Sequence, residues 1–164
     1  MPSVELVGDW AKIRHLLGGG LSQKIHAAVR RATLKSALLL VREIKKGIRS
    51  QAPGGHAFAP LSPITIDRKG SSKALIDTGF LINSITQVVL KDKAFIGLLK
   101  TAVGPDGASR ENIGAVMEYG ATITQPNGHT IIIPPRPFMH PTFAACKPQI
   151  VKYYHDALKA CLNA

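Results

Sequence analysis

Residues 22–50, SQKIHAAVRRATLKSALLLVREIKKGIRS, form the stretch that decides the fold. We expect one long helix from about Ser22 to Ser50, because the strong breaker Pro53-Gly54-Gly55 follows directly after it. Such a helix would be roughly 43 Å long. At the helical repeat its apolar side chains gather on one side, which is expected to face the core. They are Val29, Leu40, Ile44 and Ile48, with Ile25 and Val41 at the margins.

The opposite side of this predicted helix carries six basic residues in a narrow row, which we call the basic stripe. They are Lys24, Arg31, Lys35, Arg42, Lys46 and Arg49. Glu43 is the only acidic residue in the segment, so like charges repel one another along this face. A solvated face usually mixes charges of both signs, which favours a partner-facing or DNA-facing stripe over its alternative, plain solvated surface. Leu38 and Leu39 flank the stripe, and we expect part of this side to meet another protein.

Downstream of this helix, cap and turn residues divide the chain into short elements. Asp77 or Thr78 can cap a helical turn, and Gly120 can end a helix. Pro126-Asn127-Gly128 is a clear hairpin turn between two β-rich segments. The predicted elements are, in order, a short helix near Ile64–Lys69, a helical turn through Ser84, strands at Ile85–Leu90 and Ala94–Val103, a helix at Glu111–Tyr119, strands at Ala121–Thr124 and Thr130–Ile133, and a helix from Pro141 to about Leu162.

These elements predict an α+β fold, in which a long N-terminal helix and a C-terminal helix pack on a small antiparallel sheet of two hairpins. The length of 164 residues suits a single domain, residues 1–164. Within it, we expect residues 1–20 to form an N-terminal arm, where Asp9 caps a short helix through about Leu17. Residues 21–164 form the predicted core.

The composition is that of a globular protein with a large excess of positive charge. Hydrophobic residues make up 45% of the chain, charged residues 19% and aromatic residues only 5%, so the core should be mostly aliphatic. The formal net charge of +11 favours a nucleic acid, an acidic partner or acidic neighbours in an assembly; simple solubility is the alternative. We find no apolar run long enough for a bilayer and no secretion signal, and expect no membrane association.

The sequence offers little catalytic or metal-binding chemistry. The six histidines form no H-x-x-x-H or H-E-x-x-H pair, and Ser62 and Ser84 lack a nucleophile signature. The glycine-rich segment 18–24 lacks the spacing of a phosphate loop. Cys146 and Cys161 would lie about 22 Å apart along one helix, so we expect both to be reduced. We therefore predict no enzyme activity, no cofactor and no metal.

Four further segments follow one another in a distinctive order. They are Phe58-Ala59-Pro60-Leu61 with Thr65 and Lys69, Leu75-Ile76-Asp77-Thr78-Gly79-Phe80-Leu81 with Ser84-Ile85, Ala115-Val116-Met117-Glu118-Tyr119-Gly120, and Ile133-Pro134-Pro135-Arg136-Pro137-Phe138. Together with the long first and last helices, this series resembles the phage virion morphogenesis proteins, a family of tail-completion or neck proteins of tailed bacteriophages. The resemblance covers roughly residues 22–162. It departs from the family at Met117, where a histidine is frequent.

This resemblance implies a structural virion protein, made in the host cytoplasm, that forms a ring at the head–tail junction. The ring would be a homo-oligomer, hexameric or dodecameric, that completes the tail and joins it to the head. Its implied partners are neighbouring head-connector and tail proteins. Nonspecific contact between the basic stripe and DNA in the channel is a further expectation.

The residues of these motifs suit structural roles. Gly79 and Gly120 fit tight backbone with positive φ, and the prolines at 134–137 stiffen a segment that delivers Phe138 into a packed site. Arg136 is the one charged residue in that rigid run. We expect it to pair either with Glu118 in the same chain or across a subunit boundary.

The sequence is also compatible with three other functions. A tail-terminator ring is close in class, a nonspecific nucleic-acid-binding protein would use the basic helix, and an enzyme would need a site formed only in space. A ring seen by electron microscopy would favour the neck or terminator role. Salt-dependent binding of random duplex DNA would favour the nucleic-acid-binding role.

Overall fold

The computed structural model describes residues 18, 20–91, 93–104 and 107–162. The short helix expected from Asp9 to Leu17 lies outside these residues, as does most of the expected N-terminal arm. The elements are α2 (Gly20–Ser50), η1 (Pro53–Gly55), α3 (Pro63–Lys69), α4 (Phe80–Ser84), β1 (Ile85–Leu90), β2 (Lys93–Leu98), α5 (Arg110–Tyr119), β3 (Ala121–Thr124), β4 (Thr130–Ile133) and α6 (His140–Leu162). The predicted α+β class and the predicted order of elements are confirmed.

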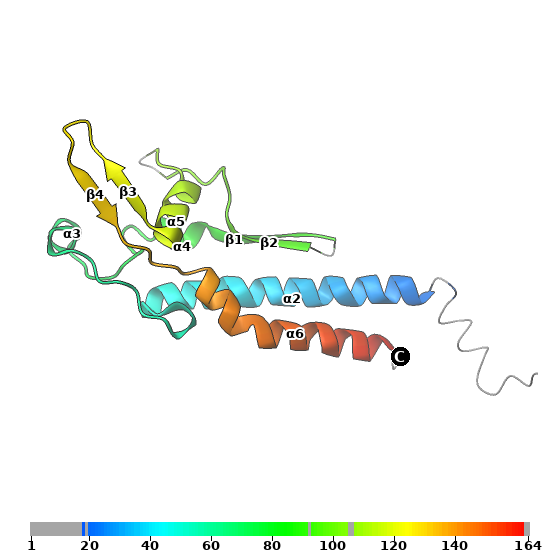
Figure 1. Ribbon diagram of the computed structural model, residues 1–164. Coiled ribbons are helices and arrows are strands. Elements are labelled where there is room, and N and C mark those ends of the chain that lie inside the picture. Colours follow the sequence, from blue (N-terminus) through cyan, green and yellow to red (C-terminus); the bar gives the residue numbers. More distant parts are fainter. Residues whose placement is uncertain (1–17, 19, 92, 105–106, 163–164) are drawn as a thin grey trace, which may run out of the picture.

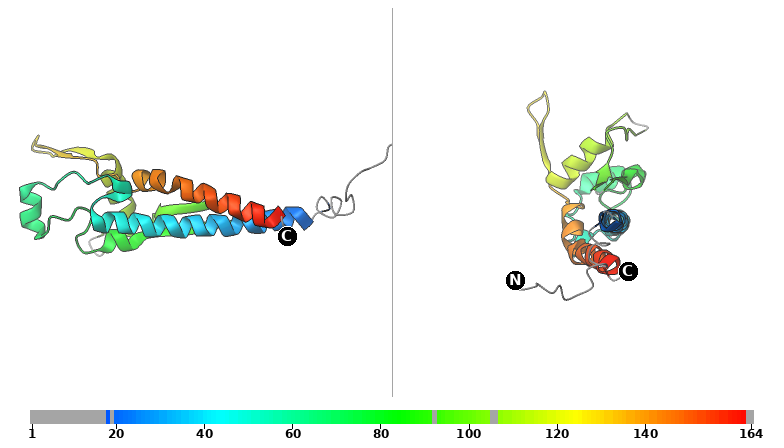
Figure 2. Two further views of the ribbon diagram at one scale, coloured as in Figure 1. Left: turned by 90° about the horizontal axis from the view of Figure 1, so that it is seen from below. Right: turned by 90° about the vertical axis from the view of Figure 1, so that its right-hand side faces the viewer.

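Helix α2 is the axis around which the other elements are arranged (Figure 1). Helix α6 runs antiparallel along one side of it, and the β1–β2 hairpin lies on the opposite side, as the end-on view in Figure 2 shows. Helices α3 and α5 and the β3–β4 hairpin gather towards the C-terminal end of α2 (Figure 1). Because α2 has neighbours on two sides, Leu40, Ile44 and Ile48 are fully buried while Val29 is half-buried.

Small side chains on α2 favour close packing against α6. Ala28, Ala32 and Ser36 recur at every fourth position of α2, and all three are buried. The distance between packed helices depends on the side chains at the contact, so these residues permit a close approach. The two helices are also joined by a hydrogen bond of 2.7 Å between the hydroxyl groups of Thr33 and Tyr154.

Both cysteines lie buried on α6, and neither forms a disulfide bond, as the sequence predicts. Burial raises the pKa of the Cys146 thiol, and the nearby Glu43 carboxylate adds to this effect, while Arg42 opposes it. The reactive thiolate is therefore disfavoured at neutral pH, which is typical of a structural cysteine.

The β1–β2 hairpin covers the second side of α2. Its register places Ile85 opposite Leu98, and Ile85 is buried in the core, whereas Phe95 on the outer face is exposed. The sequence pattern extends the second strand to Val103, but the strand ends at Leu98. Beyond it the backbone turns, and Val103 forms only an isolated bridge to Ser109.

The β3–β4 hairpin forms a sheet of its own, which corrects the expectation of one sheet built from both hairpins. Within the described residues, β1 pairs with β2 and β3 pairs with β4, and no strand joins the two pairs. The physical reason is that α5 separates them, and the second hairpin leaves the end of α5 away from α2 (Figure 1). Most of its side chains are exposed, so it has no core face to bury against the first sheet.

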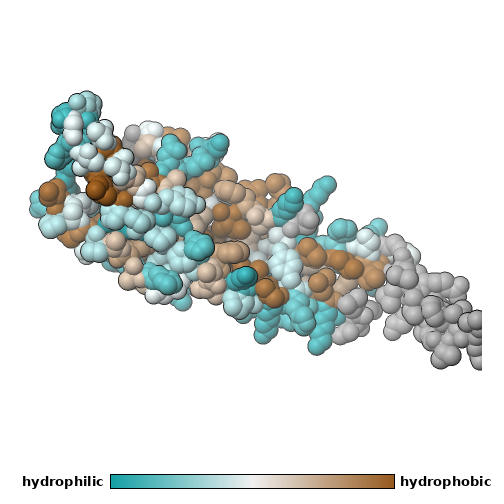
Figure 3. All heavy atoms as spheres, viewed as in Figure 1, coloured by the Kyte–Doolittle hydropathy of each residue, from teal (hydrophilic) through white to brown (hydrophobic). Residues whose placement is uncertain are grey.

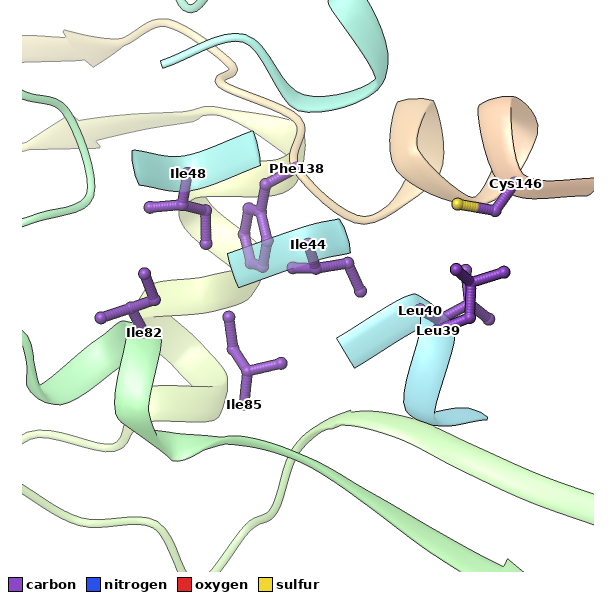
Figure 4. Packing of buried hydrophobic residues seen from close by; sticks show 8 residues of the cluster. All are labelled: Leu39, Leu40, Ile44, Ile48, Ile82, Ile85, Phe138 and Cys146. Atoms are coloured by element: carbon purple, nitrogen blue, oxygen red, sulfur yellow. The ribbon is translucent and has the colours of Figure 1, made fainter. Parts of the chain in front are cut away.

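The main hydrophobic cluster lies where α2, α4, β1 and the start of α6 meet (Figure 4). Phe138 is 1% exposed, and its ring lies among the isoleucines of the neighbouring elements. These are Ile44 and Ile48 of α2, Ile82 of α4 and Ile85 of β1. Phe138 is the one aromatic residue among the buried members of this cluster, which agrees with the low aromatic content of the chain.

Gly47 provides a test of the packing between α2 and η1. Replacing glycine by alanine in a helix interior normally stabilises it by about 0.5–1 kcal/mol. At Gly47 an added Cβ would lie only 2.6 Å from Cα of Pro53. We therefore expect Gly47→Ala to lower the free energy of unfolding by about 1–3 kcal/mol, measured by urea denaturation. The matched control is Gly20→Ala, where an added Cβ meets nothing within 4 Å; a stabilising Gly47→Ala would contradict the described packing.

Candidate functional site

The side chain of Arg136 ties the proline-rich segment to the loop after η1. Its Nε donates a hydrogen bond of 2.8 Å to the carbonyl oxygen of Ala59, and its Nη2 donates one of 2.7 Å to that of Pro60. The guanidinium is buried, which lowers the pKa of Arg136. The expected intrachain pair with Glu118 is wrong, because the guanidinium donates its hydrogen bonds to these carbonyl oxygens instead. No described contact tests the alternative of a pair across a subunit boundary.

Glu118 instead caps the start of α6. Its Oε2 accepts hydrogen bonds from the backbone N–H groups of Phe138, at 2.8 Å, and Met139, at 3.0 Å. Its Oε1 accepts a third bond of 2.9 Å from the N–H of His140. A carboxylate at this place satisfies N–H groups that the helix itself leaves free and interacts favourably with the helix dipole.

Glycine is required at two of the predicted motif positions. Gly79 precedes α4 and has φ of 77° and ψ of −1°, a left-handed conformation that side chains disfavour. Gly120 ends α5 with φ of 77°, and an added Cβ there would lie 2.9 Å from the carbonyl oxygen of Ile133. Thr78, one of the two expected caps of α4, accepts a long hydrogen bond of 3.4 Å from the N–H of Phe80; Asp77 accepts none that the structure describes.

The four motifs surround one open groove of about 1150 Å³. Pro60 and Leu61 of the first motif, Gly79 and Phe80 of the second, Met117 of the third and Arg136 of the fourth all line it. The predicted motif residues Gly79 and Arg136 are therefore brought together, while Phe138 lies in the core.

Two further cations line this groove: Lys69, which belongs to the first motif, and Arg110, which was not singled out from the sequence. Arg110, the first residue of α5, is buried and lies over the ring of Phe80, with 4.9 Å between its Cζ and the ring centroid. The pKa of Lys69 is lowered overall, mainly by burial of its ammonium group. The Asp77 carboxylate opposes this shift, and the positive charge of Arg136 adds to it. No local pattern marks Arg110, because the aromatic ring that it contacts lies thirty residues earlier in the chain.

The basic stripe lies on the exposed side of α2, as predicted. All six of its side chains are exposed. Arg42 and Lys46 reach Glu43, with N···O distances of 2.9 and 3.9 Å, and the ammonium of Lys35 lies 5.7 Å from the centroid of the Tyr153 ring. Surface pairs of this kind contribute little stability. The ion pairs between described residues do not involve Lys24, Arg31 or Arg49.

The two leucines that flank the stripe have different environments. Leu39 is 8% exposed and belongs to the chain's own core, so its expected role in meeting another protein is wrong. It is buried because α6 and the sheet extend the buried side of α2 beyond the predicted apolar face. Leu38 is 50% exposed, and Leu34, one helical turn before it, is 45% exposed.

The described residues offer no metal cluster and no membrane-spanning helix. No group of three or more His, Cys, Asp or Glu residues among them could hold a metal ion. None of the described helices is both long enough and apolar enough to cross a membrane. The remaining notable surface is apolar: brown patches interrupt the hydrophilic surface in Figure 3, and the exposed apolar side chains include Leu90, Phe95 and Ile132.

The chain matches no protein-family model, no curated protein and no solved structure.

Proposed function

We propose that the protein is a structural subunit of a tailed-bacteriophage virion, which forms a ring at the neck, completes the tail and joins it to the head. The observation that supports this most is the meeting of the four family-like motifs. Arg136 of the fourth motif is bonded to Ala59 and Pro60 of the first, and Glu118 of the third holds the backbone after Pro137. The second motif lines the same groove. Residues that act as one structural unit give the resemblance a physical basis.

Ring formation would use the exposed apolar surfaces of the two hairpins. Leu90 is 67% exposed and Ile132 is 74% exposed, although both lie in strands. Each two-stranded sheet also has edges that no described strand covers. A closed ring requires a heterologous contact, in which two different surfaces of the subunit meet. The hairpins and the groove supply surfaces of different shape for such a contact.

The test of this proposal is the mass and shape of the purified full-length protein. We expect light scattering coupled to size-exclusion chromatography to give a mass of six or twelve subunits, and negative-stain images to show closed rings. Virions assembled without the protein should have separate heads and tails. A stable monomer at high concentration, with normal particles in its absence, would rule the proposal out.

A nonspecific nucleic-acid-binding protein is the second candidate, and the basic stripe is the observation that favours it. Six exposed cations in one row can contact phosphates without reading sequence. Binding of random duplex DNA by a monomer, with affinity that falls steeply as salt is raised, would support this candidate. A ring that does not bind DNA would exclude it.

The stripe should matter for joining heads to tails and not for folding. We expect the variant R31Q/K35Q/R42Q to keep its melting temperature within about 2 °C of the wild type, because all three side chains are exposed. The same variant should weaken the joining of heads to tails, because a partner that supplies negative charge loses its attraction. Normal yields of infectious particles from this variant would instead make the stripe ordinary solvated surface.

A further inference from the structure

Two exposed leucines lie among the cations of α2. Leu34 and Leu38 are one helical turn apart and about half exposed. Residues three or four positions apart are neighbours on a helix surface. Arg31 therefore lies one turn before Leu34, and Lys35 lies one turn before Leu38. Arg42 lies one turn after Leu38. The result is an apolar centre with a basic border.

This face of α2 is open in the described structure. Viewed along α2, helix α6 and the β1–β2 hairpin occupy two opposite sides of it, and no other described element lies over the remaining side (Figure 2). Val41 lies next to the leucines and packs against the core, so the apolar centre continues inward. The two leucines are thus held by a rigid helix and not by a loop.

The combination of exposed leucines with bordering cations distinguishes between kinds of partner. Phosphates of a nucleic acid would use the cations but would leave the leucines in contact with water or with charged groups. A protein surface with an apolar side chain bordered by carboxylates would use both, because protein interfaces bury an apolar centre inside a polar rim. Charge complementarity then fixes the register and speeds association.

A second copy of this chain is a poor match for such a surface, because its formal net charge is +11 and it would bring mainly like charge to the stripe. The described acidic residues are Glu43, Asp67, Asp77, Glu111, Glu118 and Asp156. Glu43 already pairs within the stripe, and Glu118 already holds the start of α6. Residues 1–17 contain as many bases as acids, namely Glu5, Asp9, Lys12 and Arg14. Charge complementarity therefore favours an acidic surface on a different protein.

We propose that the face made by Leu34, Leu38, Arg31, Lys35 and Arg42 is the docking surface for a different, acidic protein, which presents apolar side chains bordered by Asp or Glu. This deepens the proposed function, on which it rests for the identity of the assembly: the partner would be a neighbouring component of the neck and not DNA. The basic border attracts the partner, and the two leucines supply the buried contact.

The experiment measures binding of three labelled probes to the purified full-length protein by fluorescence anisotropy. The probes are a glutamate-rich helical peptide with two leucines one turn apart, the same peptide with serines in their place, and a random-sequence DNA duplex. The proteins are the wild type, L34A/L38A and the matched control F143A/V151A, which removes two apolar side chains of α6 that are 51% and 58% exposed. Alanine keeps α2 helical.

We expect the leucine peptide to bind the wild type about tenfold more tightly than the serine peptide. L34A/L38A should remove this difference, and F143A/V151A should keep it. Equal affinity for the two peptides would overturn the proposal in favour of simple charge attraction. Tightest binding of the duplex, unchanged in L34A/L38A, would overturn it in favour of nucleic acid.

The two proposals can fail separately. A wild-type ring that binds both peptides equally would remove the docking surface but keep the ring subunit. A monomer with leucine-dependent binding would keep the docking surface but remove the ring.

Discussion

Phe138→Ala is expected to lower the free energy of unfolding by about 3–5 kcal/mol. The side chain is 1% exposed and fills the space between α2, α4 and β1, so its removal leaves a cavity that the rigid isoleucines around it cannot close. For a domain of this size, the melting temperature should fall by roughly 6–20 °C. Urea denaturation followed by circular dichroism measures the free energy directly.

Phe143→Ala is the matched control for this prediction. Phe143 lies near the start of α6, five residues after Phe138, but is 51% exposed. Its replacement should change the free energy of unfolding by no more than about 0.5 kcal/mol. If Phe138→Ala does not fold, Phe138→Leu should fold and be less stable than the wild type. Equal stability of the wild type and both Phe138 variants would show that the ring is not buried.

Glu118→Ala should cost about 2–4 kcal/mol, the second largest loss that we expect. Three backbone N–H groups at the start of α6 donate to this one carboxylate. Without it they lose charge-assisted hydrogen bonds that the helix cannot replace. The loss should appear as faster amide exchange at Phe138, Met139 and His140, as well as in urea denaturation.

Two further variants separate the cap from a general effect of charge. Glu111→Ala removes a carboxylate from the first turn of α5, where no described backbone bond depends on it, and should cost less than about 1 kcal/mol. Glu118→Gln keeps one acceptor oxygen but loses the charge, so its stability should lie between those of the wild type and Glu118→Ala. Unchanged amide exchange at 138–140 in Glu118→Ala would contradict the cap.

The long helix shows how far local pattern can predict this chain. The apolar side and the basic stripe of α2 follow from helical periodicity, and both are found where the pattern puts them. The extent of burial was underestimated, because periodicity shows that one side is apolar but not that α6 and β1–β2 cover two sides. Leu39 was therefore placed on the outside, and the exposed Leu34 was overlooked.

The contacts of Glu118 and Arg136 show what the local sequence pattern cannot predict. The sequence identified Glu118 and Arg136 as important, and opposite charges made them natural partners. The structure gives each a different partner, because Ala59 and Pro60, more than seventy residues from Arg136, bring their carbonyl oxygens to the guanidinium. A free carbonyl or N–H group leaves no mark in the sequence, so its partner is visible only after folding.

The sequence by itself determined the order and limits of most elements, the hairpin turn at Pro126-Asn127-Gly128, the glycine positions and the exposed stripe. These features depend on φ preferences and on side-chain spacing within a few residues, which the chain carries locally. Only the tertiary structure decided that the hairpins form two sheets, that Glu118 caps α6 and that Arg136 binds carbonyl groups. Each of these depends on which distant backbone atoms are brought together, and that is fixed by the packing of α2 against its neighbours.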